Sequence, residues 1–199
     1  MRKDLFINLI GIILIIVGIY RLLQIIYIAE DFPRYFWLCN SSPLIAGFAI
    51  LFRSSFVLIG EFSIIFIPQF LWSLDFFYFL FTKNFPIGSS MYVLNETLLS
   101  QIASISVHFL VLPLSLTAIF LIGKESKRAW KFSFVLFSIL IPIILYYGRE
   151  YNLNFFFQHN LGFLPIISFY SVIFPIFYIL LVVFPVNLLI NFLIRKFKK

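Results

Sequence analysis

The sequence contains little charge. Of its 199 residues only 12% are charged, whereas 62% are hydrophobic, and the mean hydropathy is +1.06. A soluble domain usually carries about 25% charged residues, so this composition excludes an ordinary water-soluble globular protein. The 8 acidic residues also do not form the aspartate-rich cluster that would hold Mg²⁺ for phosphoryl transfer to lipids.

Cysteine and histidine are scarce as well. Cys39 is the single cysteine, which excludes an internal disulfide and any CxxC metal or redox motif. The sequence has 2 histidines and lacks a GxxxxGK[ST] phosphate loop, an HExxH motif and a GxSxG motif. We therefore expect neither a metal site nor a bound cofactor.

Long apolar segments are what the sequence has in abundance. A membrane-spanning helix needs about 20 mostly apolar residues. Six segments approach or exceed this length, over residues 5–28, 35–51, 56–81, 99–122, 130–147 and 163–194. They predict an all-α polytopic membrane protein of six transmembrane helices, built as one membrane domain over residues 1–199.

The first and last segments carry special features. The first follows Arg2 and Lys3 as a secretory signal would, but its apolar stretch is too long and no cleavage site of small residues follows, so we expect a retained helix. The last segment contains Pro165, Pro175 and Pro185. Each proline removes a backbone donor, so we expect one long helix that is broken at one of them.

The distribution of basic residues tests the number of crossings. With six helices, 11 Lys and Arg residues fall on the side of the two termini and 3 on the opposite side. Cytoplasmic loops carry an excess of Lys and Arg, so the sequence predicts that both termini are cytoplasmic. Five or seven crossings would spoil this asymmetry. The same distribution accounts for the net charge of +7 without a nucleic-acid partner.

An ionisable residue inside a membrane segment is a candidate functional group. His108 lies about 13 Å into the fourth segment, at a rise of about 1.5 Å per residue. Gln101, Ser104 and Ser115 share its helical face, which we expect to face the interior of the bundle. Two interpretations stay open: a hydrogen bond that joins helices, or proton transfer near neutral pH. His159 belongs to a predicted loop, where we expect it to be solvated.

Cys39 begins the second segment at the same, non-cytoplasmic end. Ser42, Ala46 and Gly47 share its helical face, and small residues there are typical of close helix packing. A lone buried cysteine is usually an inert apolar side chain. The alternative is a nucleophile whose thiol gives its proton to a neighbouring histidine, with Ser41 and Ser42 as other candidate nucleophiles.

Two acids lie on nearly one stripe of the third segment, Glu61 and Asp75. Asp75, near the outer interface, is positioned to orient His108 as the acid of a hydrolase triad orients its histidine. Glu61 lies near the cytoplasmic end. We expect Arg53 or Lys124 to neutralise it in a structural ion pair.

Short motifs in two of the segments resemble a known family. The segment His108-Phe-Leu-Val-Leu-Pro113 resembles the H-x-x-V-L-P signature of the androgen-induced transmembrane hydrolases. Trp37-Leu-Cys39 is similar to the L-C segment of YwaF-like bacterial membrane proteins and of a transmembrane acyltransferase relative. The order of residues 152–154, 161–162 and 165 is also similar. This resemblance implies an intramembrane lipid acyl hydrolase or acyltransferase with Cys39 as nucleophile and His108 as general base.

The sequence departs from this family at two positions. The hydrolase branch has threonine as nucleophile, so Cys39 matches the acyltransferase branch better, and Trp37 replaces a histidine expected in the bacterial branch. In the implied reaction the thiolate attacks a lipid ester, and water or a lipid alcohol then accepts the acyl group. Asn40, Ser42 or the backbone freed near Pro43 are the candidate oxyanion donors.

Two other functions stay open. Six helices in about 200 residues also suit the small-molecule binding subunits of vitamin-uptake systems, although Gly11 and Gly18 match their docking pattern of small residues only weakly. A scaffold without chemistry is the third hypothesis. In each case we expect membrane lipids as the surroundings, and as the substrate in the first. We expect the plasma membrane of a prokaryote as the location.

Overall fold

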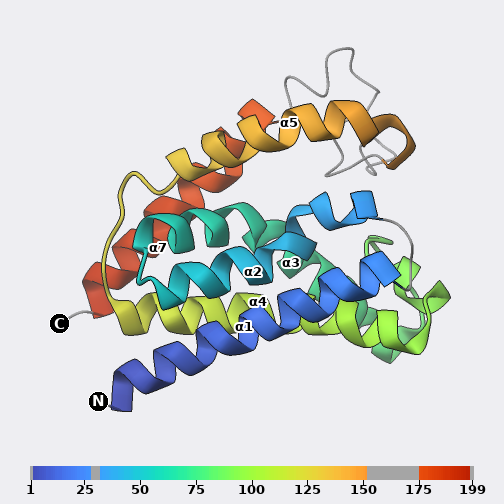
Figure 1. Ribbon diagram of the computed structural model, residues 1–199, viewed down its shortest axis with the longest axis horizontal. Helices are drawn as coiled ribbons and strands as arrows, with labels where there is room; N and C mark the ends of the chain where they lie inside the picture. Colours follow the sequence, from blue (N-terminus) through green and yellow to red (C-terminus); the bar gives the residue numbers. More distant parts are fainter. Residues whose placement is uncertain (1, 28–31, 152–174, 198–199) are drawn as a thin grey trace.

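The computed structural model describes residues 2–27, 32–151 and 175–197, and every regular element in these ranges is a helix (Figure 1). The elements are α1 (Arg2–Tyr27), η1 (Phe32–Phe36), α2 (Leu38–Leu51), α3 (Ser55–Thr82), η2 (Met91–Asn95), α4 (Leu98–Ile122), α5 (Lys131–Tyr151), η4 (Ile179–Val183) and α7 (Phe184–Phe197). The predicted all-α class is confirmed for this part of the chain. His159, the motif residues 152–165 and the first part of the sixth predicted segment lie outside the described residues.

Within the described residues, four helices are long and apolar enough to cross a membrane: α1, α3, α4 and the helix Pro175–Phe197, which includes η4 and α7. Helix α2 has 14 residues. The apolar segment of α5 within Lys131–Leu140 is shorter still. Leucine, isoleucine and phenylalanine side chains cover much of the outer surface of the bundle, as expected where the solvent is lipid. The chain is therefore an integral membrane protein.

Helix α2 begins at Leu38, later than the predicted start at residue 35. The short 3₁₀ helix η1 occupies the preceding residues. It contains Pro33, which has a fixed φ and no N–H to donate. Trp37 then adopts an extended conformation, with φ −61° and ψ 125°, and caps α2. As a result Cys39 lies in the first turn of α2, closer to the end of the bundle than predicted.

Helices α1 and α2 pack closely through glycines. A Cβ atom at Gly18 would lie 2.6 Å from Leu44 Cγ, and one at Gly47 would lie 2.9 Å from the carbonyl oxygen of Gly11. Small residues allow helix backbones to approach in this way. The glycines of α1 therefore pack against α2 of the same chain, so they are not evidence for the docking of another subunit.

The last helix contains a π-turn next to a proline. Pro185 has no N–H, so it cannot bond to the carbonyl of Leu181 as a regular α-helix requires. Over Ile179–Val183 the backbone widens to a π-helix, and the N–H of Phe184 bonds to the carbonyl of Ile179. The helix nevertheless continues to Phe197. At Pro185, one of the three prolines at which a break was predicted, the helix therefore has a π-turn and stays continuous.

The beginning of α1 and the ends of α4 and α7 meet at one end of the bundle (Figure 1). Lys3, Phe120 and Phe197 line one hollow there, and the rings of Phe120 and Phe197 are 5.9 Å apart. Arg195 Nε lies 3.4 Å from Glu125 Oε2. The opposite end carries η1, η2 and the last turns of α1.

Candidate functional site

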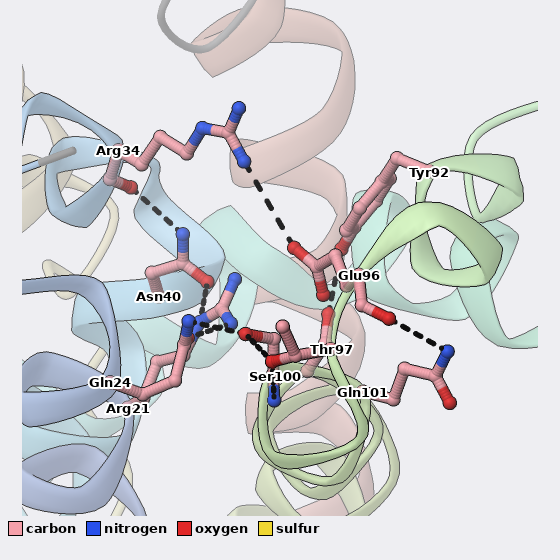
Figure 2. Close-up of polar contacts among 10 residues, drawn as sticks. Arg21, Gln24, Arg34, Asn40, Tyr92, Glu96, Thr97, Ser100 and Gln101 are labelled. Carbon is pink, nitrogen blue, oxygen red and sulfur yellow. Dashed lines mark hydrogen bonds and ion pairs between the residues drawn. The ribbon is translucent and has the colours of Figure 1, made fainter. Parts of the chain in front are cut away.

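A buried polar network joins α1, α2 and α4 at the end of the bundle that carries η1 and η2 (Figure 2). Arg21 Nε donates to Asn40 Oδ1 at 2.9 Å, and Arg21 Nη1 donates to Gln24 Oε1 at 2.5 Å. Gln24 Nε2 donates to Ser100 Oγ at 2.7 Å, and the hydroxyls of Ser100 and Thr97 lie 3.0 Å apart. We call these five residues the Arg21 network. It ties α1, α2 and α4 together, and the side chains of Arg21, Gln24, Asn40 and Ser100 are nearly inaccessible to solvent, whereas Thr97 is exposed.

Residues of η1 and of the segment before α4 border this network. Arg34 Nη1 lies 4.0 Å from Glu96 Oε1, and the Arg34 carbonyl accepts a 2.8 Å hydrogen bond from Asn40 Nδ2. Gln101 Nε2 donates to the Glu96 carbonyl at 3.1 Å. Burial raises the pKa of the Glu96 carboxyl, while the charges of Arg21 and Arg34 act in the opposite direction. The carboxyl of Glu96 is thus a partly buried acid near two cations.

The structure places Cys39 beside this network. It is the second residue of α2, and its side chain is half-buried and unoxidised. Its electrostatic neighbours are Arg21 and Glu61, and the backbone N–H groups of Cys39 and Asn40 lie next to its sulfur. Among the described residues no hydrogen bond joins Cys39 to His108.

His108 is buried in α4 and is oriented by its own helix. Its Nδ1 lies 2.8 Å from the carbonyl oxygen of Ser104. A carbonyl oxygen can only accept, so Nδ1 carries a hydrogen, and in the neutral form of the imidazole Nε2 therefore has the lone pair. The ring stacks on Trp72, with centroids 4.0 Å apart and planes 18° apart. Ser104 thus orients His108, a role that the sequence analysis predicted for Asp75.

Asp75 has a different set of partners. Its carboxylate accepts five hydrogen bonds of 2.8–3.2 Å: from the backbone N–H groups of Ile87, Gly88 and Ser90 and from the hydroxyls of Ser89 and Ser90. It therefore anchors the connection between α3 and η2. In the described ranges it makes no hydrogen bond to His108, and its predicted catalytic role stays a prediction.

The candidate oxyanion donors have different surroundings. Both polar atoms of the Asn40 amide are used, by Arg21 and by the Arg34 carbonyl. The Ser42 hydroxyl is fully buried, has no hydrogen-bond partner among the described residues, and is a neighbour of Glu61. Pro43 leaves a carbonyl of the previous turn without its helical donor. A carbonyl cannot stabilise an oxyanion.

Glu61 is fully buried in α3, and the ion pair predicted for it is absent from the described part of the chain. Arg53 instead approaches Asp4, at 3.7 Å, and donates to Asn8 at 2.8 Å. No salt bridge joins Lys124 to Glu61 in these ranges. Neither carboxyl oxygen of Glu61 has a hydrogen-bond partner among the described residues. The prediction of a structural ion pair was wrong because Arg53 adopts a left-handed turn, with φ 54°, and extends toward α1.

Tyr92 in η2 is a site residue that the sequence analysis missed. Its hydroxyl lies 2.9 Å from Ser104 Oγ, one helical turn from His108. Burial raises the pKa of Tyr92 to about 12, and negative charge on Cys39 and Glu96 acts in the same direction. Tyr92 is therefore a common neighbour of the thiol and of the residue that orients the imidazole.

Arg21 was also missed as a site residue. The rule that singled out Glu61, Asp75 and His108, an ionisable residue inside a membrane segment, applies equally to Arg21. Its charge acts on Cys39, Tyr92, Glu96 and His108. The side chains around Arg21 offer a thiol, an imidazole, a phenol and a carboxyl, which suit nucleophilic and acid–base chemistry. No group of three His, Cys, Asp or Glu residues in the described ranges is arranged to hold a metal ion.

No protein-family model matches this chain, and no curated protein or solved structure is significantly similar to it. The family resemblance carried by the short motifs around Cys39 and His108 therefore stays a prediction.

Proposed function

We propose that the chain is an intramembrane lipid acyl hydrolase or acyltransferase, in which Cys39 is the nucleophile and His108 the general base. The observation that carries the proposal is that both residues adjoin the polar end of the bundle. Cys39 directly precedes Asn40 of the Arg21 network in the first turn of α2. His108 bonds to the carbonyl of Ser104, whose hydroxyl contacts η2 at the same end. Both candidate catalytic groups therefore belong to one polar end of an otherwise apolar bundle. Lipid esters lie at the corresponding depth, near the boundary between headgroups and acyl chains.

The position of Cys39 suits a nucleophile. It lies in the first turn of α2, and the N-terminus of a helix favours negative charge. The N–H groups of Cys39 and Asn40 next to the sulfur are the same kind of donor that stabilises an oxyanion. We therefore assign the oxyanion role to these backbone groups in place of the Asn40 and Ser42 side chains.

The position of His108 suits a base. Because Nδ1–H is held by Ser104, Nε2 is the basic nitrogen. In the proposed reaction the thiol of Cys39 gives its proton to Nε2 while sulfur attacks the ester carbonyl carbon. The C–O bond then breaks, the protonated imidazole returns the proton to the leaving alcohol, and the acyl group stays on sulfur as a thioester.

The second half of the reaction restores the enzyme. Water or a lipid alcohol gives its proton to Nε2 of His108 and attacks the thioester, and sulfur leaves and recovers that proton. The products are a free fatty acid in hydrolysis, or a new ester in acyl transfer. The thiol and imidazole have no mutual hydrogen bond in the described structure, so the proposal requires them to meet when the substrate binds.

The proposed enzyme crosses the plasma membrane of a prokaryote six times, with both termini in the cytoplasm. This topology rests on the excess of Lys and Arg on the side of the termini. The proximity of the first turn of α1 to the last turn of α7 supports it, since an even number of crossings returns the chain to the starting side. Single cysteines at Ser126 and at Ser89, each in a Cys39→Ser background, test it with a membrane-impermeant maleimide on whole cells. Six crossings require labelling at position 89 and protection at position 126.

An acyl-chain probe with a cysteine-reactive chloroacetamide head tests the chemistry. The purified protein in detergent is treated with the probe, and labelled peptides are identified by mass spectrometry. We expect modification of Cys39 in the wild type, none in Cys39→Ala, and labelling about 100-fold slower in His108→Ala. Ser41→Ala is the matched control and should label normally. Full lipid-ester turnover by Cys39→Ala would sink the proposal.

A small-molecule binding subunit is the second candidate. Its support is the set of interior polar atoms without hydrogen-bond partners in the described residues, in Glu61 and Gln69, since such atoms are the usual contacts of a bound ligand. Stabilisation of the protein by a vitamin, with no turnover of lipid esters, would favour it. A scaffold without a site predicts neither result.

A further inference from the structure

Arg21 is a buried cation that is in direct contact with no acid among the described residues. Its side chain is 3% exposed. Its two hydrogen bonds go to the amide oxygens of Asn40 and Gln24, which are neutral. No salt bridge involves Arg21 in the described part of the chain. The polar end of the bundle thus contains a buried guanidinium group.

The neighbouring acid does not fill this role. Glu96 is close enough to act electrostatically on Arg21, but its nearest cation is Arg34, at 4.0 Å. Its Oε2 atom has no hydrogen-bond partner among the described residues.

The network holds the guanidinium in a fixed orientation. Asn40 is anchored by the Arg34 carbonyl, and Gln24 is anchored by Ser100. These contacts use Nε and one N–H of Nη1, and no hydrogen bond of Nη2 to a described residue occurs. A planar fork with unused N–H groups, held by its other donors, matches the geometry of a phosphate or a carboxylate.

We propose that Arg21 binds the phosphate of a ligand, and that the ligand is a glycerophospholipid of the surrounding membrane. The inference deepens the proposed function, on which the identity of the substrate rests. In a glycerophospholipid the acyl ester lies a few bonds from the phosphate. Binding of that phosphate at Arg21 therefore brings the ester to Cys39, an electrostatic neighbour of the same guanidinium.

Glu96 serves in this proposal as the competing internal anion. Its negative charge near Arg21 and Arg34 partly neutralises the empty site and opposes the entry of phosphate. Replacing Glu96 with glutamine removes the competing charge and keeps the shape of the side chain. Phosphate binding should then become stronger, a result that a purely structural role of Arg21 does not predict.

The test measures thermal unfolding of the full chain in an uncharged detergent at constant ionic strength. The probes are dihexanoyl phosphatidylglycerol, dihexanoylglycerol, which lacks the phosphate, and inorganic phosphate. We expect the phospholipid alone to raise the unfolding temperature of the wild type. We expect its apparent Kd to rise about tenfold in Arg21→Gln and to fall severalfold in Glu96→Gln. Arg53→Gln, which removes a cation at the opposite end, should bind as the wild type does.

Each outcome decides part of the proposal. In one outcome, inorganic phosphate stabilises the wild type as much as the lipid does, and Arg21→Gln abolishes this stabilisation. This outcome supports the phosphate site and overturns a lipid as the source of the phosphate. Equal binding by wild type and Arg21→Gln overturns the site itself. If Arg21→Gln does not fold, unchanged lipid affinity in Glu96→Gln overturns it. Arg21-dependent lipid binding without probe labelling of Cys39 would refute acyl transfer and leave the phosphate site intact.

Discussion

Asp75 offers the sharpest test of how the end of the bundle that carries η1 and η2 is held together. Its carboxylate accepts five hydrogen bonds from residues 87–90. Asp75→Asn keeps the size of the side chain but turns one acceptor oxygen into a donor. If the amide oxygen stays with the N–H groups of Ile87 and Gly88, the new NH₂ faces Ser90, whose N–H then loses its acceptor.

The cost follows from these contacts. A buried N–H without an acceptor costs about 1–3 kcal/mol. The remaining bonds lose their charge-assisted strength, since bonds to a charged group contribute about 1.5–3 kcal/mol and neutral ones about 1. The serine hydroxyls can rotate and accept from the new NH₂, which limits the loss. We expect Asp75→Asn to lower the free energy of unfolding by about 2–4 kcal/mol.

The assay is thermal unfolding in detergent, combined with limited proteolysis of the connection between α3 and α4. We expect a lower unfolding temperature and faster cleavage within residues 83–97. Asp4→Asn is the control, because the Asp4 side chain is exposed and its ion pair with Arg53 should contribute little. Unchanged stability of Asp75→Asn, with selective loss of probe labelling at Cys39, would refute the anchoring role and favour the orientation of His108 by Asp75.

Three further predictions concern packing, a buried acid and pH. Gly47→Val should lower the free energy of unfolding by about 1–3 kcal/mol, because the valine side chain would clash with the Gly11 carbonyl. Phe48→Leu, on the exposed side of α2, should leave this free energy unchanged. Thermal unfolding measures both variants. Glu61→Gln should leave the free energy of unfolding unchanged or raise it, because Glu61 has no ion pair among the described residues. A decrease of this free energy by about 3–5 kcal/mol would reveal a cationic partner. Glu96→Gln should stabilise the protein at neutral pH, with an advantage that shrinks as the pH falls.

The sign of the Glu96 prediction follows from linkage. Burial raises the pKa of the Glu96 carboxyl above its ordinary value in the unfolded chain. The protonated form is therefore favoured by folding, and the resulting stability is present at low pH and lost as the pH rises through the raised pKa. Comparing the unfolding temperatures of wild type and Glu96→Gln between about pH 5 and pH 7.5 measures this difference. A constant difference across that range would contradict the raised pKa.

The sequence predicted the long helices well. The predicted segments 56–81 and 99–122 agree with α3 and α4 to within one residue at each end. Each begins after a residue whose hydroxyl accepts a backbone N–H, Ser54 or Thr97, and each ends at a left-handed residue, Lys83 or Gly123. These signals are local. The start of α2 was misplaced because η1 continues the apolar run without continuing the α-helix.

What the sequence determined by itself is the all-α class and the membrane as solvent, because composition and apolar run length do not depend on which helices are neighbours. Only the tertiary structure decided the partners of the polar residues. Arg21 donates a hydrogen bond to Asn40, 19 residues away in the sequence, and Gln24 donates one to Ser100, 76 residues away. Asp75 bonds to a connection that folds back over the end of its own helix. A polar group buried in an apolar environment is costly without a hydrogen-bond partner, and helix packing, which short motifs do not encode, determines which partners are within reach.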